Sequence, residues 1–155
     1  MKKTRKIFLS LIFYSYVFVL LIILFWRSTG EVSLSPTLII QRLRESSNLI
    51  PLHTVKSYIK AYEIGTVSST VVLFNIVGNI LIFVPMGILL PLLTPLKKAM
   101  PFLITSALTV TSIELIQLIT GLGRLDVDDL ILNLIGALVG YTVYRVFAAV
   151  KKRHL

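Results

Sequence analysis

The sequence contains no cysteine, only two histidines and only seven acidic residues in 155. The absence of cysteine excludes disulfide bonds and thiolate chemistry. The two histidines, His53 in a loop and His154 in the tail, argue against a zinc site. A phosphate-binding loop, a nucleophile elbow and a dinucleotide fingerprint are also missing from the sequence. We therefore expect no cofactor and no metal ion.

Hydrophobic residues, by contrast, make up 55% of the chain. Their arrangement in long apolar runs is typical of helices that cross a bilayer. The first run, about 20 residues long, exceeds the apolar region of a cleavable signal peptide, so we expect it to be retained. The sequence predicts an all-α, polytopic membrane protein that forms one domain, 1–155. Its four transmembrane helices are expected at about 7–26, 71–93, 101–120 and 127–150.

The loop 27–70 is the only long polar segment and carries two helical patterns. Ser35 followed by Pro36 is a typical helix start. Further on, apolar residues recur with helical spacing from Val55 to Tyr62. This second pattern fits a helix that lies on the membrane surface, and it fits a short helix packed on its neighbours equally well.

The charge pattern predicts the orientation. Basic residues gather in the N-terminal head, at Lys97 and Lys98, and in the C-terminal tail, rather than in one patch for nucleic acid. We therefore expect no nucleic-acid partner. The positive-inside rule places both termini and Lys97 in the cytoplasm. The loop 27–70 and the turn near Arg124 then lie outside.

Polar residues in the last three helices form the candidate site. A helix rises by about 1.5 Å per residue, and counting from the outer ends places these side chains at a similar depth in the outer leaflet. Ionisable groups within a membrane usually face the bundle interior or a water-filled cavity. We therefore expect one polar cavity that opens to the outside. The candidates are Asn75, Asn79, Glu114, Gln117, Arg124, Asp126, Asp128, Asp129 and Asn133.

Most of these residues also have a structural explanation. Amides in membrane helices often hydrogen-bond to neighbouring helices, which is the simpler interpretation of Asn75, Gln117 and Asn133. Asp128 and Asp129 begin a helix and would favour its dipole. Arg124 is explained as a partner for these carboxylates, and Asp126 as a turn residue.

Glu114 is the exception. Interhelical hydrogen bonding does not require a charge, and no helix cap or turn explains a carboxyl group at this position. We therefore favour a functional role for Glu114. An oxygen-ligand metal site formed with Asp128 and Asp129 has no recognised spacing.

Four motifs carry a resemblance to a known family. They read N-L-I-P-L (48–52), N-I-V-G-N-I-L-I-F-V-P-M-G (75–87), S-I-E-L-I-Q (112–117) and R-L-D-V-D-D-L-I-L-N-L-I-G-A-L-V-G-Y (124–141). In order and spacing the sequence resembles the VanZ-like family, which takes its name from the teicoplanin-resistance protein VanZ. The resemblance extends from Asn48 to about Tyr144.

The resemblance implies a small multi-pass protein of the bacterial cytoplasmic membrane, typical of Gram-positive cells. Members of the family are linked with lowered susceptibility to teicoplanin and related lipoglycopeptides. This is a form of resistance to glycopeptide antibiotics. The biochemical activity is not implied by the resemblance. The polar motif positions of the family correspond to the nine candidate residues above.

Two functions remain open from the sequence. The first is a non-catalytic protein of the cell envelope whose cavity binds the head group of a membrane lipid, a lipid-linked cell-wall precursor or a lipid-tailed antibiotic. The second is an intramembrane enzyme in which Glu114 is the general acid or base and Asp128 or Asp129 its partner. A transporter is a third and weaker hypothesis, because four spans are few for one. The oligomeric state is left open.

Overall fold

The computed structural model describes residues 3–26, 32, 34–45 and 47–153. This part of the chain is helical and contains no strand, as predicted; only an isolated bridge joins Asn48 and Asp126. The helices are α1 (Lys3–Trp26), α2 (Pro36–Glu45), α3 (His53–Glu63), α4 (Ser69–Leu93), α5 (Ala99–Thr120) and α6 (Val127–Arg153).

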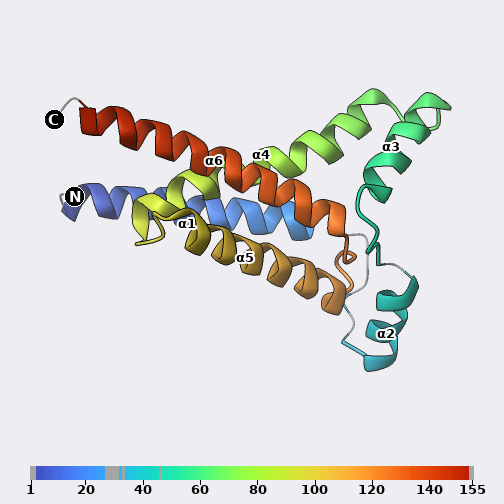
Figure 1. Ribbon diagram of the computed structural model, residues 1–155. Coiled ribbons are helices and arrows are strands. Elements are labelled where there is room, and N and C mark those ends of the chain that lie inside the picture. Colours follow the sequence, from blue (N-terminus) through green and yellow to red (C-terminus); the bar gives the residue numbers. More distant parts are fainter. Residues whose placement is uncertain (1–2, 27–31, 33, 46, 154–155) are drawn as a thin grey trace.

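Four of these helices, α1, α4, α5 and α6, are long and apolar enough to cross a membrane. They coincide with the predicted spans, and α1 begins four residues earlier than expected, at Lys3. Figure 1 shows both ends of the chain and the α4–α5 turn at one end of the bundle. Helices α2 and α3 and the α5–α6 turn lie at the opposite end. The fold therefore separates a basic end from the end that carries the candidate site.

Helices α4 and α6 form the centre of the bundle through glycine contacts. A Cβ atom added at Gly136 would overlap the carbonyl oxygen of Ile80, and one at Gly140 would overlap that of Val84. Gly87 of α4 meets α6 in the same way, against the carbonyl of Ala137. Small residues let two membrane helices approach closely and pack their backbones together. This contact positions the polar residues of α4 against those of α6.

An aromatic pair packs α5 against α6 and also secures the α4–α5 turn. The rings of Phe102 and Tyr141 stack with their centroids 4.4 Å apart. The Tyr141 hydroxyl donates to the carbonyl of Lys97 at 2.8 Å. The basic end of the bundle is thereby held together by one side chain of α6.

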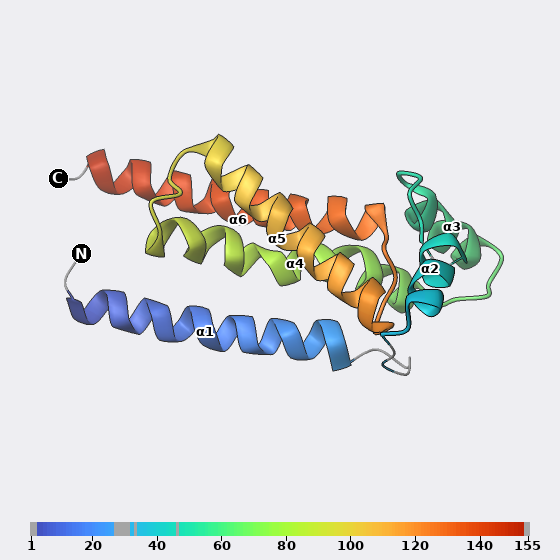
Figure 2. The same ribbon diagram turned by 90° about the horizontal axis from the view of Figure 1, so that it is seen from below.

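Helix α1 runs along one side of the other three spans (Figure 2). The hydroxyl of Tyr16 donates to the carbonyl of Ile82 in α4 at 2.8 Å. At the other end of the helix, Gln117 Nε2 donates to the carbonyl of Leu24 at 3.0 Å. Side-chain bonds to backbone carbonyls thus connect α1 to both α4 and α5.

The two short helices lie outside the bundle. Helix α2 begins at Pro36, as predicted, and its Arg42 donates to the carbonyl of Ile119 in the last turn of α5 at 3.1 Å. Helix α3 spans the segment in which the sequence pattern predicted a helix. Its Tyr58 is half-buried, whereas Ile59 and Tyr62 are 44% and 52% exposed. One face packs on the protein and another presents apolar side chains outward.

Candidate functional site

A cavity of about 670 Å³ lies between the four long helices, at the end that carries α2 and α3. Seven of the nine candidate residues line it, and they come from α4, α5, the α5–α6 turn and α6. These residues are Asn75, Asn79, Glu114, Gln117, Arg124, Asp129 and Asn133. Ile23 and Leu24 of α1 add an apolar wall. The result is a polar chamber with an apolar side inside the membrane-spanning bundle.

The α4 side of the cavity carries Asn75 and Asn79, which lie one helical turn apart and share a face. Asn79 Nδ2 donates to Asp129 Oδ1 at 2.5 Å and so joins α4 to α6. Asn75 Nδ2 instead donates to the carbonyl of Val71 in its own helix, at 2.7 Å. Asn79 therefore contributes to helix packing, whereas the hydrogen bond of Asn75 joins no second helix.

Glu114 is the more buried of the two acidic residues that line the cavity. Only 3% of its surface is exposed, and its Oε2 lies 3.5 Å from the backbone N of Asp126. The turn that follows α5 brings Asp126 to this position because Gly121 ends the helix with φ of 78°. Such a positive φ is readily adopted by glycine. The carboxyl group thus lies against the turn and lines the cavity.

Asn133 is the second buried polar residue of the cavity, with 3% of its surface exposed. Its Oδ1 has no hydrogen-bond partner among the described residues. A buried carbonyl oxygen without a partner costs about 1–3 kcal/mol. This atom is therefore available to accept a hydrogen bond from a ligand or a water in the cavity.

Asp126 does not line the cavity and instead joins the loop before α3 to the start of α6. Its Oδ1 accepts from Asn48 Nδ2 at 2.9 Å, and its Oδ2 accepts from the Thr54 hydroxyl at 2.6 Å. The same residue caps α6, because the backbone N of Asp128 donates to Oδ1 at 2.9 Å. Both carboxylate oxygens are occupied by the protein itself.

Asp128 is also committed to internal hydrogen bonds. It accepts from the backbone N of Leu52 and from that of Val55 at 3.1 Å. Asp128 therefore caps the start of α3 and not that of its own helix, α6, for which Asp126 provides the cap. Its carboxylate holds Leu52 at a φ of 64°, which is uncommon for a residue other than glycine. Among the described residues, no group of three His, Asp or Glu side chains is placed to hold a metal ion.

Asn48 and Thr54 are the residues that sequence reasoning missed. Besides the contacts with Asp126, Asn48 exchanges backbone hydrogen bonds with both neighbours of Asp126: its N donates to Leu125 O at 2.8 Å, and its O accepts from Val127 N at 2.9 Å. The only sequence signal was the position of Asn48 in the N-L-I-P-L motif. Because the contact spans 78 positions in the chain, local patterns could not predict it.

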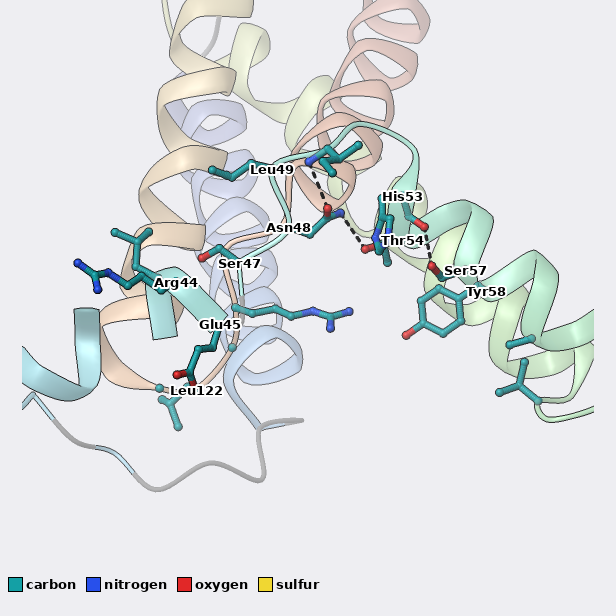
Figure 3. A pocket seen from close by; sticks show the side chains of 17 residues that line it. Arg44, Glu45, Ser47, Asn48, Leu49, His53, Thr54, Ser57, Tyr58 and Leu122 are labelled. Atoms are coloured by element: carbon teal, nitrogen blue, oxygen red, sulfur yellow. Dashed lines mark hydrogen bonds between the residues drawn. The ribbon is translucent and has the colours of Figure 1, made fainter. Parts of the chain in front are cut away.

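A larger groove of about 1220 Å³ lies beside the cavity, bounded by α2, α3 and the α5–α6 turn (Figure 3). Residues that line both spaces include Thr54, Tyr58 and Arg124. The Arg124 side chain is 54% exposed and its Nε lies 3.8 Å from Asp126 Oδ2. The cavity within the bundle and the groove outside it therefore meet at Arg124.

A family model described as VanZ/LLP1 matches residues 11–148. The chain belongs to the VanZ/LLP1 family. The match begins within α1 and ends within α6, so the cavity and the groove both fall inside it. Comparisons with curated proteins and with solved structures return no match. Family membership and four apolar helices together identify a VanZ-like multi-pass membrane protein.

Proposed function

We propose that this VanZ-like protein binds an amphiphile of the bacterial cell envelope, with the polar head in the cavity and the adjoining groove. The ligand would be a lipid-linked cell-wall precursor or a lipid-tailed antibiotic such as a lipoglycopeptide. The observation that carries the proposal is a polar cavity inside an apolar bundle, continuous in its lining with a surface groove. A cavity among helices that are apolar enough to cross a membrane can bind the head of an amphiphile whose tail stays in the bilayer.

The charge distribution supports an outward-facing site. The end of the bundle with both termini carries a group of basic residues. They are Lys3, Arg5, Lys6, Lys97, Lys98 and those of the C-terminal tail. The described acidic residues lie toward the other end, with α2, α3 and the α5–α6 turn. Under the positive-inside rule the basic end faces the cytoplasm of the bacterial cell. The groove then faces the outside, where cell-wall precursors and antibiotics are found.

The polar groups fit a phosphate or carboxylate together with sugar or peptide groups. Arg124 Nε lies 3.8 Å from Asp126 Oδ2, and a guanidinium has five N–H donors. Its remaining donors can bind an anionic head group where the two spaces meet. Elsewhere in the cavity lining, Asn75 and Asn133 provide amides for hydroxyl or peptide groups.

The apolar part of the ligand has a path along α4. Phe74 and Leu81 line the cavity and are 66% and 60% exposed, so they also face the lipid side of the bundle. Leu24 of α1 completes this wall. An acyl or prenyl chain can leave the cavity between these side chains and remain in the bilayer.

The test combines binding with susceptibility. Purified protein is titrated with a lipid-linked cell-wall precursor and with teicoplanin, and we expect saturable binding of at least one of them. In cells, teicoplanin and vancomycin susceptibility is compared between wild type and Glu114→Gln at equal membrane levels. Glu63→Gln is the matched control, because Glu63 is exposed at the end of α3. Absence of saturable binding to both ligand classes would refute the proposal.

The second candidate is an intramembrane enzyme that acts on such a lipid. The observation that favours it is the burial of the Glu114 carboxyl group in a cavity that also contains Asp129. Because both oxygens of Asp128 bind α3, Asp129 is the better partner for general acid–base chemistry. Mass spectra of membrane lipids should then differ between cells expressing wild type and Glu114→Gln. An unchanged lipid profile would eliminate the enzyme and leave the binding protein.

A further inference from the structure

We propose a second ligand site at the basic end of the bundle, which binds an anionic phospholipid from the membrane leaflet at that end. A pocket of about 740 Å³ lies there between α1, α4 and α6. Arg5 of α1, Lys97 of the α4–α5 turn and Lys151 of α6 line it together. The proposal depends on the helices crossing the bilayer and is independent of the function of the first cavity.

The three cations come from segments far apart in the sequence and meet at one pocket. None of them forms a salt bridge with a carboxylate in the described part of the chain. The described acidic residues all lie toward the opposite end of the bundle. The pocket therefore carries a concentrated positive charge for which the described residues supply no counter-ion.

The backbone that carries Lys97 is held in place. The carbonyl of Lys97 accepts from the Tyr141 hydroxyl at 2.8 Å and lies 3.5 Å from Arg145 Nη1. Arg145 also donates to the Tyr141 oxygen at 3.1 Å. Because the turn is bound to α6 in this way, Lys97 stays near Lys151, and less ordering is needed when an anion binds.

The rest of the lining is apolar and favours a lipid over a free anion. Leu92, Tyr144 and Phe147 line the pocket, and Phe147 is 71% exposed. A phosphate group can bind the three cations while its acyl chains lie against these side chains. Basic pockets between membrane helices bind anionic head groups by this combination of charge and apolar contact. Phosphatidylglycerol has the required phosphate and tails, and phosphatidylcholine has the same tails without net charge.

The experiment uses the full chain in detergent, titrated with phosphatidylglycerol, phosphatidylcholine or free glycerol 3-phosphate. Binding is measured by native mass spectrometry and by thermal unfolding. One variant combines Arg5→Gln, Lys97→Gln and Lys151→Gln. The matched control combines Lys6→Gln, Lys98→Gln and Lys152→Gln, whose positions are the next residues along the chain and do not line the pocket. Both variants lose three positive charges from the same end of the protein.

We expect phosphatidylglycerol to bind the wild type and the control with similar affinity, and the pocket variant at least about tenfold more weakly. The thermal stabilisation by this lipid should fall in parallel. Equal losses in both triple variants would mean general attraction to a basic surface and would overturn the proposal. Equal binding of phosphatidylcholine, or equally tight binding of free glycerol 3-phosphate, would overturn it as well, because recognition then uses only the tails or only the phosphate.

Discussion

The carboxylate of Asp128 in α6 accepts the backbone N–H of Val55 in α3, at 3.1 Å. It also accepts the N–H of Leu52, and these bonds satisfy two backbone donors at the start of α3, where Leu52 provides no side-chain cap. Helix α3 is thus attached to the bundle through the carboxylate of a residue in the first turn of α6. Because Thr54 and Tyr58 line the cavity and the groove, the contact also shapes the candidate site.

Replacement of Asp128 should destabilise the protein even though its side chain does not line the cavity. We expect Asp128→Ala to lower the free energy of unfolding by about 2–4 kcal/mol, because two backbone donors lose a charged acceptor. Thermal unfolding in detergent, followed by circular dichroism, measures the change. Glu63→Ala, at an exposed acid on α3, should be close to wild type. Equal stability of the two variants would contradict the capping role.

The contact between α4 and α6 predicts a steric effect of a single methyl group. Gly136→Ala should cost about 1–3 kcal/mol, because the new Cβ meets the backbone oxygen of Ile80 and not a flexible side chain. Gly78→Ala is the control, since nothing lies within 4 Å of a Cβ at that position. The control should be neutral or more stable by up to about 1 kcal/mol, because alanine is the better helix former. Thermal unfolding of both variants measures the two changes. A Gly136→Ala protein that is as stable as Gly78→Ala, or more stable, would contradict the predicted steric effect.

The two asparagines of α4 should separate binding from helix packing. Asn75→Leu should leave the free energy of unfolding within about 0.5 kcal/mol of wild type, because the hydrogen bond of Asn75 stays within α4. The same substitution should weaken ligand binding, because it removes an amide from the cavity lining. Asn79→Leu should reduce both, since it loses a bond to Asp129 of the kind worth about 0.6–2 kcal/mol. Unfolding and ligand titration of each variant provide the two readouts. If Asn75→Leu binds as well as wild type, Asn75 has no role in the site.

The attachment of α1 predicts a difference between two tyrosines of the same helix. Tyr16→Phe should lower the free energy of unfolding by about 0.5–1.5 kcal/mol, because the hydroxyl no longer donates to Ile82. Tyr14→Phe should have no measurable effect, since Tyr14 is 69% exposed. Thermal unfolding of the two variants side by side is sufficient, and equal effects would show that the Ile82 contact contributes nothing.

The orientation can be measured directly because the native chain contains no cysteine. A single Lys60→Cys on the exposed face of α3 should react with a membrane-impermeant maleimide in intact cells. A single Lys98→Cys, in the turn between α4 and α5, should react only after the membrane is permeabilised. The opposite pattern would invert the topology and place the candidate site in the cytoplasm.

Local sequence patterns determined the helices of this protein. Apolar runs of sufficient length predict spans because a bilayer requires every backbone group to be bonded within the helix. Pro36 marked the start of α2 for a similarly local reason, its fixed φ and missing N–H. Asn79, Glu114 and Asp129 line one cavity, which counting residues along each helix had predicted, because the rise of a helix is constant.

Only the tertiary structure decided which of the polar residues face the cavity. Three nearby aspartates have different partners. Asp129 lines the cavity and accepts a hydrogen bond from Asn79, whereas Asp128 accepts from the backbone of α3 and Asp126 accepts from Asn48. These partners lie 50, 73 and 78 positions away in the chain. No local pattern specifies such pairs, since they depend on where the loop before α3 docks on the bundle. The sequence by itself therefore determined the helices and which of them carry the polar groups, and long-range packing determined which carboxylates line the cavity.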